Sequence, residues 1–249
     1  MITAGVDLSS QAPRTACCVI DWADHRATII DLSLGVVDKT IADLIVEVDK
    51  LGIDVPLGWP IAFAEAIIEH SRTGTWPVEY SHADTSALRL RRTDLWVWRS
   101  LGSSPPLSVS TDRIALPAMR AASLLSSLAH PVALDGSGVV VEAYPAAALR
   151  RWGYPSRGYK GKNNSEARRS LVTSFLARTE AWLQITGEQV DRCLSSDDAF
   201  DALIVALVAR AATVALVEPI PEEDRLAAKR EGWIAVPLSG SLEVLAEDT

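Results

Sequence analysis

The chain has 249 residues, of which 48% are hydrophobic and 22% charged, and its formal net charge is −8. This is the composition of an ordinary soluble globular protein with enough chain for a substantial core. The negative charge argues against a protein that coats duplex nucleic acid through spread basic charge. It is compatible with an acidic cluster that holds divalent cations, since the cations then attract phosphate.

Neither a membrane segment nor a disulfide framework is visible in the sequence. No apolar run is long enough to cross a bilayer, and the chain opens as a strand, without the basic segment or cleavage site of a secretion signal. The cysteines, Cys17, Cys18 and Cys193, show no zinc-ligand spacing and are expected to be small buried residues. We therefore expect a cytoplasmic protein without a membrane partner.

The first half of the chain predicts a strand meander and then a parallel strand. The β-rich segments of the meander cover residues 2–8, 15–22 and 26–34. The last two are expected to form a hairpin that turns at Asp24-His25. Helical spacing of apolar residues over 37–51 leads to a short strand over 53–58. Because a helix between two strands favours parallel pairing, that strand should lie beside the first one.

The second half of the chain is expected to be mainly helical around one central strand. Residues 139–145 form a near-continuous apolar run, typical of a strand that is covered on both faces. The tail at 233–237 is compatible with an edge strand. We expect a single domain over 1–249, with a less regular helical and loop insertion at about 59–137. Helices are expected over 60–72, 111–127, 145–152, 165–183 and 197–215.

Three carboxylates stand at the start of the last long helix: Asp197, Asp198 and Asp201. Beyond them this helix is apolar on nearly all sides, which indicates burial, and buried carboxylates are costly unless they are paired, hydrogen-bonded or bound to a cation. Helix capping and the helix dipole can account for the first two acids but not for Asp201, which lies a turn further in. Which of the three faces the site stays open, because a one-residue shift of the helix start changes the pair.

Acids also lie at or near the ends of three predicted strands: Asp7, Asp54 and Glu142. The carboxyl edge of a parallel sheet is where α/β proteins place their sites. With Asp198 and Asp201, these acids predict a site for Mg²⁺ or Mn²⁺, which prefer oxygen ligands.

Each strand-end acid also has a simpler interpretation, which for Asp54 is that of a lone acid inside its strand, at a cost in burial. Asp7 could cap a turn, and Glu142 could form an ion pair with Arg150 or Lys160.

Basic residues close to these acids are candidates for holding phosphate. Arg91 and Arg92 belong to a run of arginines, and guanidinium groups bind phosphate oxygens in pairs. Lys160 lies in a glycine-bearing loop that suits a mobile substrate contact. The simpler interpretations are a solvated basic face and an ion pair between Asp94 and its neighbouring arginines.

The order of the elements is that of the RNase H-like fold, whose sites use carboxylates on central strands and on a later helix. We therefore expect an α/β protein of the RNase H-like type: a mixed five-stranded sheet, its first three strands antiparallel, flanked by helices on both faces.

Six short segments in this order also resemble the motifs of a bacterial and archaeal family, domain-of-unknown-function family 429. They are Gly5-Val6-Asp7, Ile53-Asp54-Val55-Pro56-Leu57-Gly58, Arg91-Arg92-Thr93-Asp94, Glu142-Ala143-Tyr144-Pro145, Tyr159-Lys160 and Asp197-Asp198-Ala199-Phe200-Asp201-Ala202. The resemblance runs from residue 2 to about residue 217. It implies a predicted nuclease with an RNase H-like fold and the acidic positions named above, although a fold does not by itself carry a function.

Our leading hypothesis is a divalent-metal-dependent nuclease that hydrolyses DNA or RNA. Two cations can clamp the entering and leaving oxygens of a phosphodiester, which explains the need for several acids. The alternatives are a non-catalytic binding or scaffold protein on the same fold and an ATP-dependent phosphotransferase of the actin and sugar-kinase type. The phosphotransferase is disfavoured because the turn Leu8-Ser9-Ser10 lacks the expected glycine and no Walker-type loop is present. The expected catalytic and metal-binding residues are Asp7, Asp54, Glu142, Asp198 and Asp201, and the expected substrate-binding residues are Arg91, Arg92 and Lys160.

Overall fold

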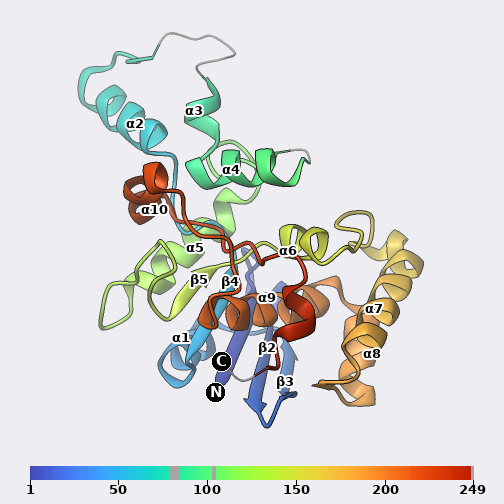
Figure 1. The fold of residues 1–249 in the computed structure, drawn as a ribbon. Coiled ribbons are helices and arrows are strands. Elements are labelled where there is room, and N and C mark those ends of the chain that lie inside the picture. The colour runs from blue at the N-terminus through green and yellow to red at the C-terminus, as the bar shows by residue number, and fades with distance from the viewer. Residues whose placement is uncertain (79–84, 103–104, 248–249) are drawn as a thin grey trace.

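A mixed sheet runs through the centre of the protein (Figure 1). The structure, a computed structural model, describes residues 1–78, 85–102 and 105–247, and in these residues the sheet has six strands in the order β5-β4-β1-β2-β3-β6. The strands are β1 (Ile2–Asp7), β2 (Ala16–Ala23), β3 (Arg26–Leu34), β4 (Lys50–Asp54), β5 (Val140–Glu142) and β6 (Leu183–Gln184).

The strand directions agree with the expected meander and crossover. β1, β2 and β3 pair antiparallel in sequence, whereas β4 lies parallel to β1 and β5 lies parallel to β4. Asp24 and His25 both have positive φ angles, of 50° and 57°. A two-residue turn of this kind matches the twist of the strands it joins, which explains the tight hairpin between β2 and β3.

The expectation of five strands is wrong, because β6 adds a sixth in the described part of the chain. β6 has only two residues and pairs in parallel with Ala27 and Thr28 of β3. It falls where the helix over 165–183 was expected to end, but that helix stops at Thr179. Trp182 then stacks on Trp22, with ring centroids 6.0 Å apart, next to the new strand. A two-residue strand carries no periodic pattern, so it is invisible to sequence reasoning.

The helices agree with the sequence in most places. Those expected over 37–51, 60–72, 111–127, 145–152, 165–183 and 197–215 are all present with shorter or shifted ends. The tail forms single bridges, Ile234 to Glu142 and Pro237 to Val217, where an edge strand was considered. No helix in the described residues is long and apolar enough to cross a membrane. The helices are α1 (Asp38–Glu47), α2 (Ile61–Thr73), α3 (Thr85–Arg89), α4 (Arg92–Leu101), α5 (Ala115–Ser126), α6 (Pro145–Arg151), α7 (Ser165–Thr179), α8 (Gly187–Ser195), α9 (Asp197–Thr213) and α10 (Arg225–Glu231).

Helices cover both faces of the sheet, and alternate strand residues point to one face or the other. The neighbours Cys17 and Cys18 show this: Cys18 packs in the core under α9, while Cys17 packs in the core under α1 and α5. In Figure 1, α9 crosses the sheet, and α2, α3 and α4 gather beyond one end of it.

The buried helix α9 lies directly against the central strands. Its residues from Ala199 to Ala211 are all buried, as expected for a helix that is apolar on nearly all sides. Gly5 of β1 and Gly52 of β4 make this approach possible, because they carry no Cβ where the α9 backbone passes. The close contact sets how far α9 lies above the ends of β1 and β4.

Candidate functional site

Two of the expected site residues end neighbouring parallel strands. Asp7 is the last residue of β1 and Asp54 the last of β4, and they are partners in the strand register, as are Gly5 and Gly52 two residues earlier. Since side chains alternate between faces, each aspartate lies on the same face as its glycine, which is the face that α9 covers. The two carboxylates therefore meet at the sheet edge beneath the start of α9.

The third acid of this cluster is Asp201, in the second turn of α9. It is fully buried. The Tyr159 hydroxyl donates a 2.7 Å hydrogen bond to its Oδ1, and Lys160 Nζ lies 2.5 Å from its Oδ2. The Lys160 contact is an ion pair without the alignment of a hydrogen bond, so Oδ2 accepts no hydrogen bond in the described residues.

The other two acids of α9 lie further out. Asp197 accepts a 3.2 Å hydrogen bond from the Gly161 backbone and lies 3.7 Å from Arg168. Asp198 is partly exposed, and burial, followed by the charge of Asp197, raises its pKa. The helix cap itself is Ser196, which accepts a hydrogen bond from the Ala199 amide. Of the three acids, Asp201 is the one that faces the strand-end aspartates.

Lys160 supplies positive charge to the three aspartates. Burial alone would lower its pKa, but Asp201 and Asp54, with a smaller contribution from Asp7, raise the pKa well above its ordinary value. The lysine is carried on a loop in which Gly158 and Gly161 have positive φ angles, of 79° and 87°. Glycine adopts this conformation without strain, so the loop can turn Lys160 back towards α9.

Lys160 does not offset the effect of burial on the two strand-end carboxylates. Burial, more than the charges of Asp201 and Glu142, raises the pKa of Asp54 to about 7, and Lys160 opposes this rise. Burial, followed by the charges of Asp54 and Asp201, raises the pKa of Asp7 well above its usual range. Neither strand-end carboxylate accepts a hydrogen bond from any group in the described part of the chain. Such a site favours the binding of protons or of a cation.

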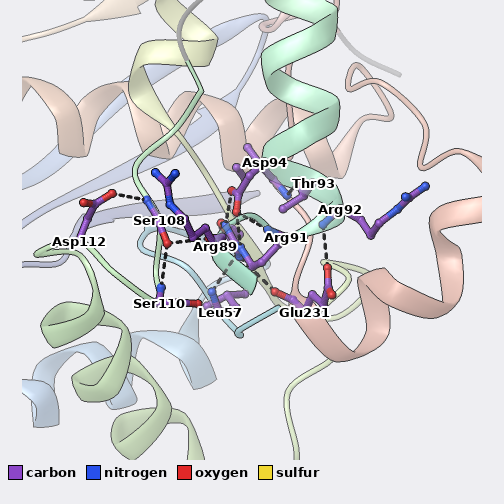
Figure 2. A network of polar contacts seen from close by, with 12 residues as sticks. Leu57, Arg89, Arg91, Arg92, Thr93, Asp94, Ser108, Ser110, Asp112 and Glu231 are labelled. Carbon is purple, nitrogen blue, oxygen red and sulfur yellow. Dashed lines mark hydrogen bonds and ion pairs between the residues drawn. The ribbon is translucent and has the colours of Figure 1, made fainter. Parts of the chain in front are cut away.

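Glu142 is held in a separate ion-pair network with Arg91 and Asp94. Figure 2 shows Arg91 and Asp94 of this network. Two 2.7 Å hydrogen bonds from the Arg91 guanidinium reach the two oxygens of Glu142, and the Leu57 amide donates a third of 3.0 Å. The same guanidinium donates to both oxygens of Asp94, at 2.9 and 3.1 Å. Arg91, Asp94 and Glu142 are all buried. The expected pairing of Asp94 with its own arginines is confirmed, whereas Arg91, and neither Arg150 nor Lys160, is the partner of Glu142.

Glu231 of α10 completes the network and was missed by sequence reasoning. Its carboxylate accepts a 2.8 Å hydrogen bond from the Ile61 amide and a 2.7 Å hydrogen bond from the Arg92 amide, at the first residues of α2 and α4. One carboxylate thus stabilises the positive ends of two helices. Its backbone carbonyl accepts a bond from Arg91. Because the partners of Glu231 lie 139 and 170 positions away in the chain, no local sequence pattern predicts this role.

Arg92 also has a structural contact outside the carboxylate cluster. Its Nε donates a 2.6 Å hydrogen bond to Asp224, and half of the side chain is exposed.

A pocket of about 240 Å³ opens over the cluster. Asp7, Asp54, Lys160 and the network of Glu142 and Arg91 form its polar side. Its apolar side is formed by residues that include Leu8, Pro106, Leu107, Ile114, Pro117 and Ile234. Asp198, Asp201 and Arg92 do not line this pocket.

The chemistry of the site suits a hard cation at Asp7 and Asp54. Carboxylate oxygens are the ligands that Mg²⁺ and Mn²⁺ prefer, and these two are not engaged by hydrogen bonds in the described residues. The third carboxylate, Asp201, is engaged by Lys160 and Tyr159. Accordingly, no group of three or more histidines, cysteines, aspartates or glutamates within 1–78, 85–102 and 105–247 is arranged to hold a metal.

The raised pKa of Asp54 predicts that the metal-free protein loses stability as the pH rises. Between the ordinary pKa of 3.8 and about 7, the folded protein keeps a proton that the unfolded chain has released. The free energy of unfolding should therefore fall across this window, and this contribution should be constant at higher pH. The melting temperature of Asp54→Asn should exceed that of wild type by an amount that grows as the pH rises through this window. A difference that does not change with pH would contradict the prediction.

A comparison with family models places most of the site within one family. The model described as "Protein of unknown function (DUF429)" matches residues 5–226. The match includes all five predicted acids, Lys160 and the Arg91–Asp94 segment, and it ends before Glu231. No curated protein and no solved structure shows significant similarity to the chain. The match spans most of the 249 residues, so the chain belongs to the DUF429 family, as its sequence motifs predicted.

Proposed function

We propose that the protein is a divalent-metal-dependent nuclease that hydrolyses phosphodiester bonds of DNA or RNA. The observation that carries this function is the pairing of Asp7 with Asp54 at the sheet edge, beside Asp201. The pocket over this pair is lined by more carboxylates than basic side chains. The strand order and the antiparallel first three strands support an RNase H-like fold for this site.

Asp7 and Asp54 would hold Mg²⁺ or Mn²⁺ directly, with Asp201 joining them when Lys160 turns to the substrate. A cation bound there would activate water and balance the charge of the phosphate. Lys160 is the proposed phosphate contact, because its amino group already lies among the aspartates that would surround the reacting phosphate. Both oxygens of Glu142 are engaged by Arg91 and the Leu57 amide, so we assign Glu142 a positioning role at the end of β5.

Removing the charge of Lys160 should make the protein depend more on a divalent cation. Lys160→Met leaves the fully buried Asp201 without its cation, which should lower the melting temperature of the metal-free protein. The loss should stay below the roughly 3–5 kcal/mol of a fully buried pair, because the Lys160 side chain is 51% exposed. Mg²⁺ should then stabilise this variant more than wild type, since Asp201 is free to bind the ion.

Lys162→Met is the matched control for that variant, because Lys162 is an exposed lysine of the same loop. This control should melt near the wild-type temperature both without metal and with Mg²⁺. A Lys160→Met protein that Mg²⁺ stabilises less than wild type would contradict the proposed position of the cation.

The proposed function is tested by titrating Mg²⁺ and Mn²⁺ into metal-free wild-type protein and then measuring cleavage of labelled DNA and RNA. We expect a saturable rise in melting temperature and cleavage that a chelator stops. Cleavage that is insensitive to chelators would overturn the metal-dependent mechanism.

A non-catalytic binding protein is the second candidate, favoured by the fact that basic side chains of the chain itself already neutralise Asp201 and Glu142. It would show no cation-dependent rise in melting temperature and no cleavage.

A further inference from the structure

The apolar side of the pocket is a firmly held wall. Part of it is the segment from Pro106 to Pro117, whose proline rings fix the local backbone. Asp112 accepts a 2.7 Å hydrogen bond from the Ser108 amide, and the Ser108 hydroxyl donates to the Arg89 carbonyl at 2.7 Å (Figure 2). Val109, next to Ser108, is completely buried in the core under α1 and α5. The wall therefore keeps its place opposite the carboxylates.

The rim of this wall carries apolar and aromatic side chains. Leu107 is 58% exposed although it lines the pocket. Tyr144 also lines the pocket and adds an aromatic ring near Asp54. An apolar wall facing a charged floor suits a ligand that carries a phosphate at one end and a flat, weakly polar group at the other.

The size of the pocket limits that ligand to about one nucleotide. Its volume of about 240 Å³ lies just under the range of roughly 300–1,000 Å³ in which drug-sized ligands bind. In a duplex the faces of the bases are stacked on one another and only their edges can be reached in the grooves, so no base could stack on the wall. In a single strand a base can turn outward and stack on apolar or aromatic side chains.

We propose that the pocket binds a single unpaired nucleotide, with its phosphate between Lys160 and a divalent cation on Asp7 and Asp54, and with its base against the wall that contains Leu107. In terms of the proposed nuclease function, on which this substrate class rests, the enzyme cleaves single strands or unpaired ends in preference to duplexes.

Binding of thymidine 5′-monophosphate and of ribose 5-phosphate, each with Mg²⁺ present, tests the contact with the base. The nucleotide should bind wild type at least about tenfold more tightly, as expected for one stacked base. Leu107→Asn should remove most of this advantage and leave ribose 5-phosphate binding unchanged. Leu116→Asn is the matched control, because Leu116 is 61% exposed on α5 of the same insertion and does not line the pocket. It should bind both ligands as wild type does.

Cleavage of one labelled oligonucleotide as a single strand and as a duplex tests the substrate class. Wild type should cleave the single strand at least about tenfold faster, and Leu107→Asn should reduce this preference. Equal binding of the two small ligands, or equal cleavage of the single strand and the duplex, would overturn the assignment even if Mg²⁺ stabilises the protein and cleavage occurs. Tight nucleotide binding without cleavage of the single strand or the duplex would support the pocket assignment and overturn the nuclease function instead.

Discussion

Replacing Asp7 by asparagine should strongly weaken cation binding and abolish nucleic-acid cleavage while it stabilises the metal-free protein. The ionised carboxylate of Asp7 is disfavoured by burial and by the charges of Asp54 and Asp201, which is why its pKa is raised. Asparagine has nearly the same shape and no charge, so it removes this repulsion. At about 2–4 °C per kcal/mol for a chain of this size, relief of about 1 kcal/mol would be readily measured.

The same substitution should weaken Mg²⁺ binding by more than about 100-fold, which is the upper range for the loss of a group that only supports a metal ligand. Cleavage should be lost in parallel. Melting temperatures with and without Mg²⁺ and a labelled-strand cleavage assay measure both effects. Asp191→Asn is the control, because it removes the same charge from an exposed position on α8. An Asp7→Asn protein that is less stable without metal, or that Mg²⁺ still stabilises, would contradict the proposed role of Asp7.

The strand-end aspartates were predictable because their placement follows from local patterns. A strand ending on Asp7, a helix, and a short strand containing Asp54 imply parallel neighbours, and parallel neighbours end at one edge of the sheet. The α9 acids were harder to rank, since their order depended on where the helix begins. Only the structure, with Ser196 as the cap, separates Asp201 from Asp197 and Asp198.

The ion-pair partners were not predictable, because a long charged side chain can pair with any of several groups of opposite charge that are distant in the sequence. Glu142 finds Arg91, 51 positions away, and the chain offers 24 lysines and arginines from which to choose. Lys160 was expected to contact a substrate phosphate, and in the structure it forms an ion pair with Asp201.

The helix α8 was also not predicted, although the sequence contains a start signal for it. Thr186 at the N-cap and Gln189 in the first turn of α8 form a capping box, a pattern that the sequence already contained.

Gly5→Ala should be strongly destabilising, although it adds only one methyl group. A Cβ at this position would lie 2.1 Å from the Ala206 nitrogen and 2.3 Å from the Ala202 oxygen, both in the backbone of α9. Side-chain rotation cannot relieve backbone contacts, so α9 would have to move away from β1. Overpacking typically costs about 1–3 kcal/mol and occasionally more, and we expect at least the upper value here. The melting temperature should fall by about 6–12 °C.

The Gly5→Ala variant also links the fold to the site. Asp201 directly precedes Ala202, so a displaced α9 carries Asp201 away from Asp7 and should weaken Mg²⁺ binding even in the fraction that folds. Gly187→Ala is the control, since nothing lies within 4 Å of a Cβ at that position, and it should be neutral or stabilising by about 0.4–1 kcal/mol. If Gly5→Ala melted like wild type, α9 could not lie against β1 as described. If it were destabilised but bound Mg²⁺ with full affinity, Asp201 would be excluded as a member of the cation site.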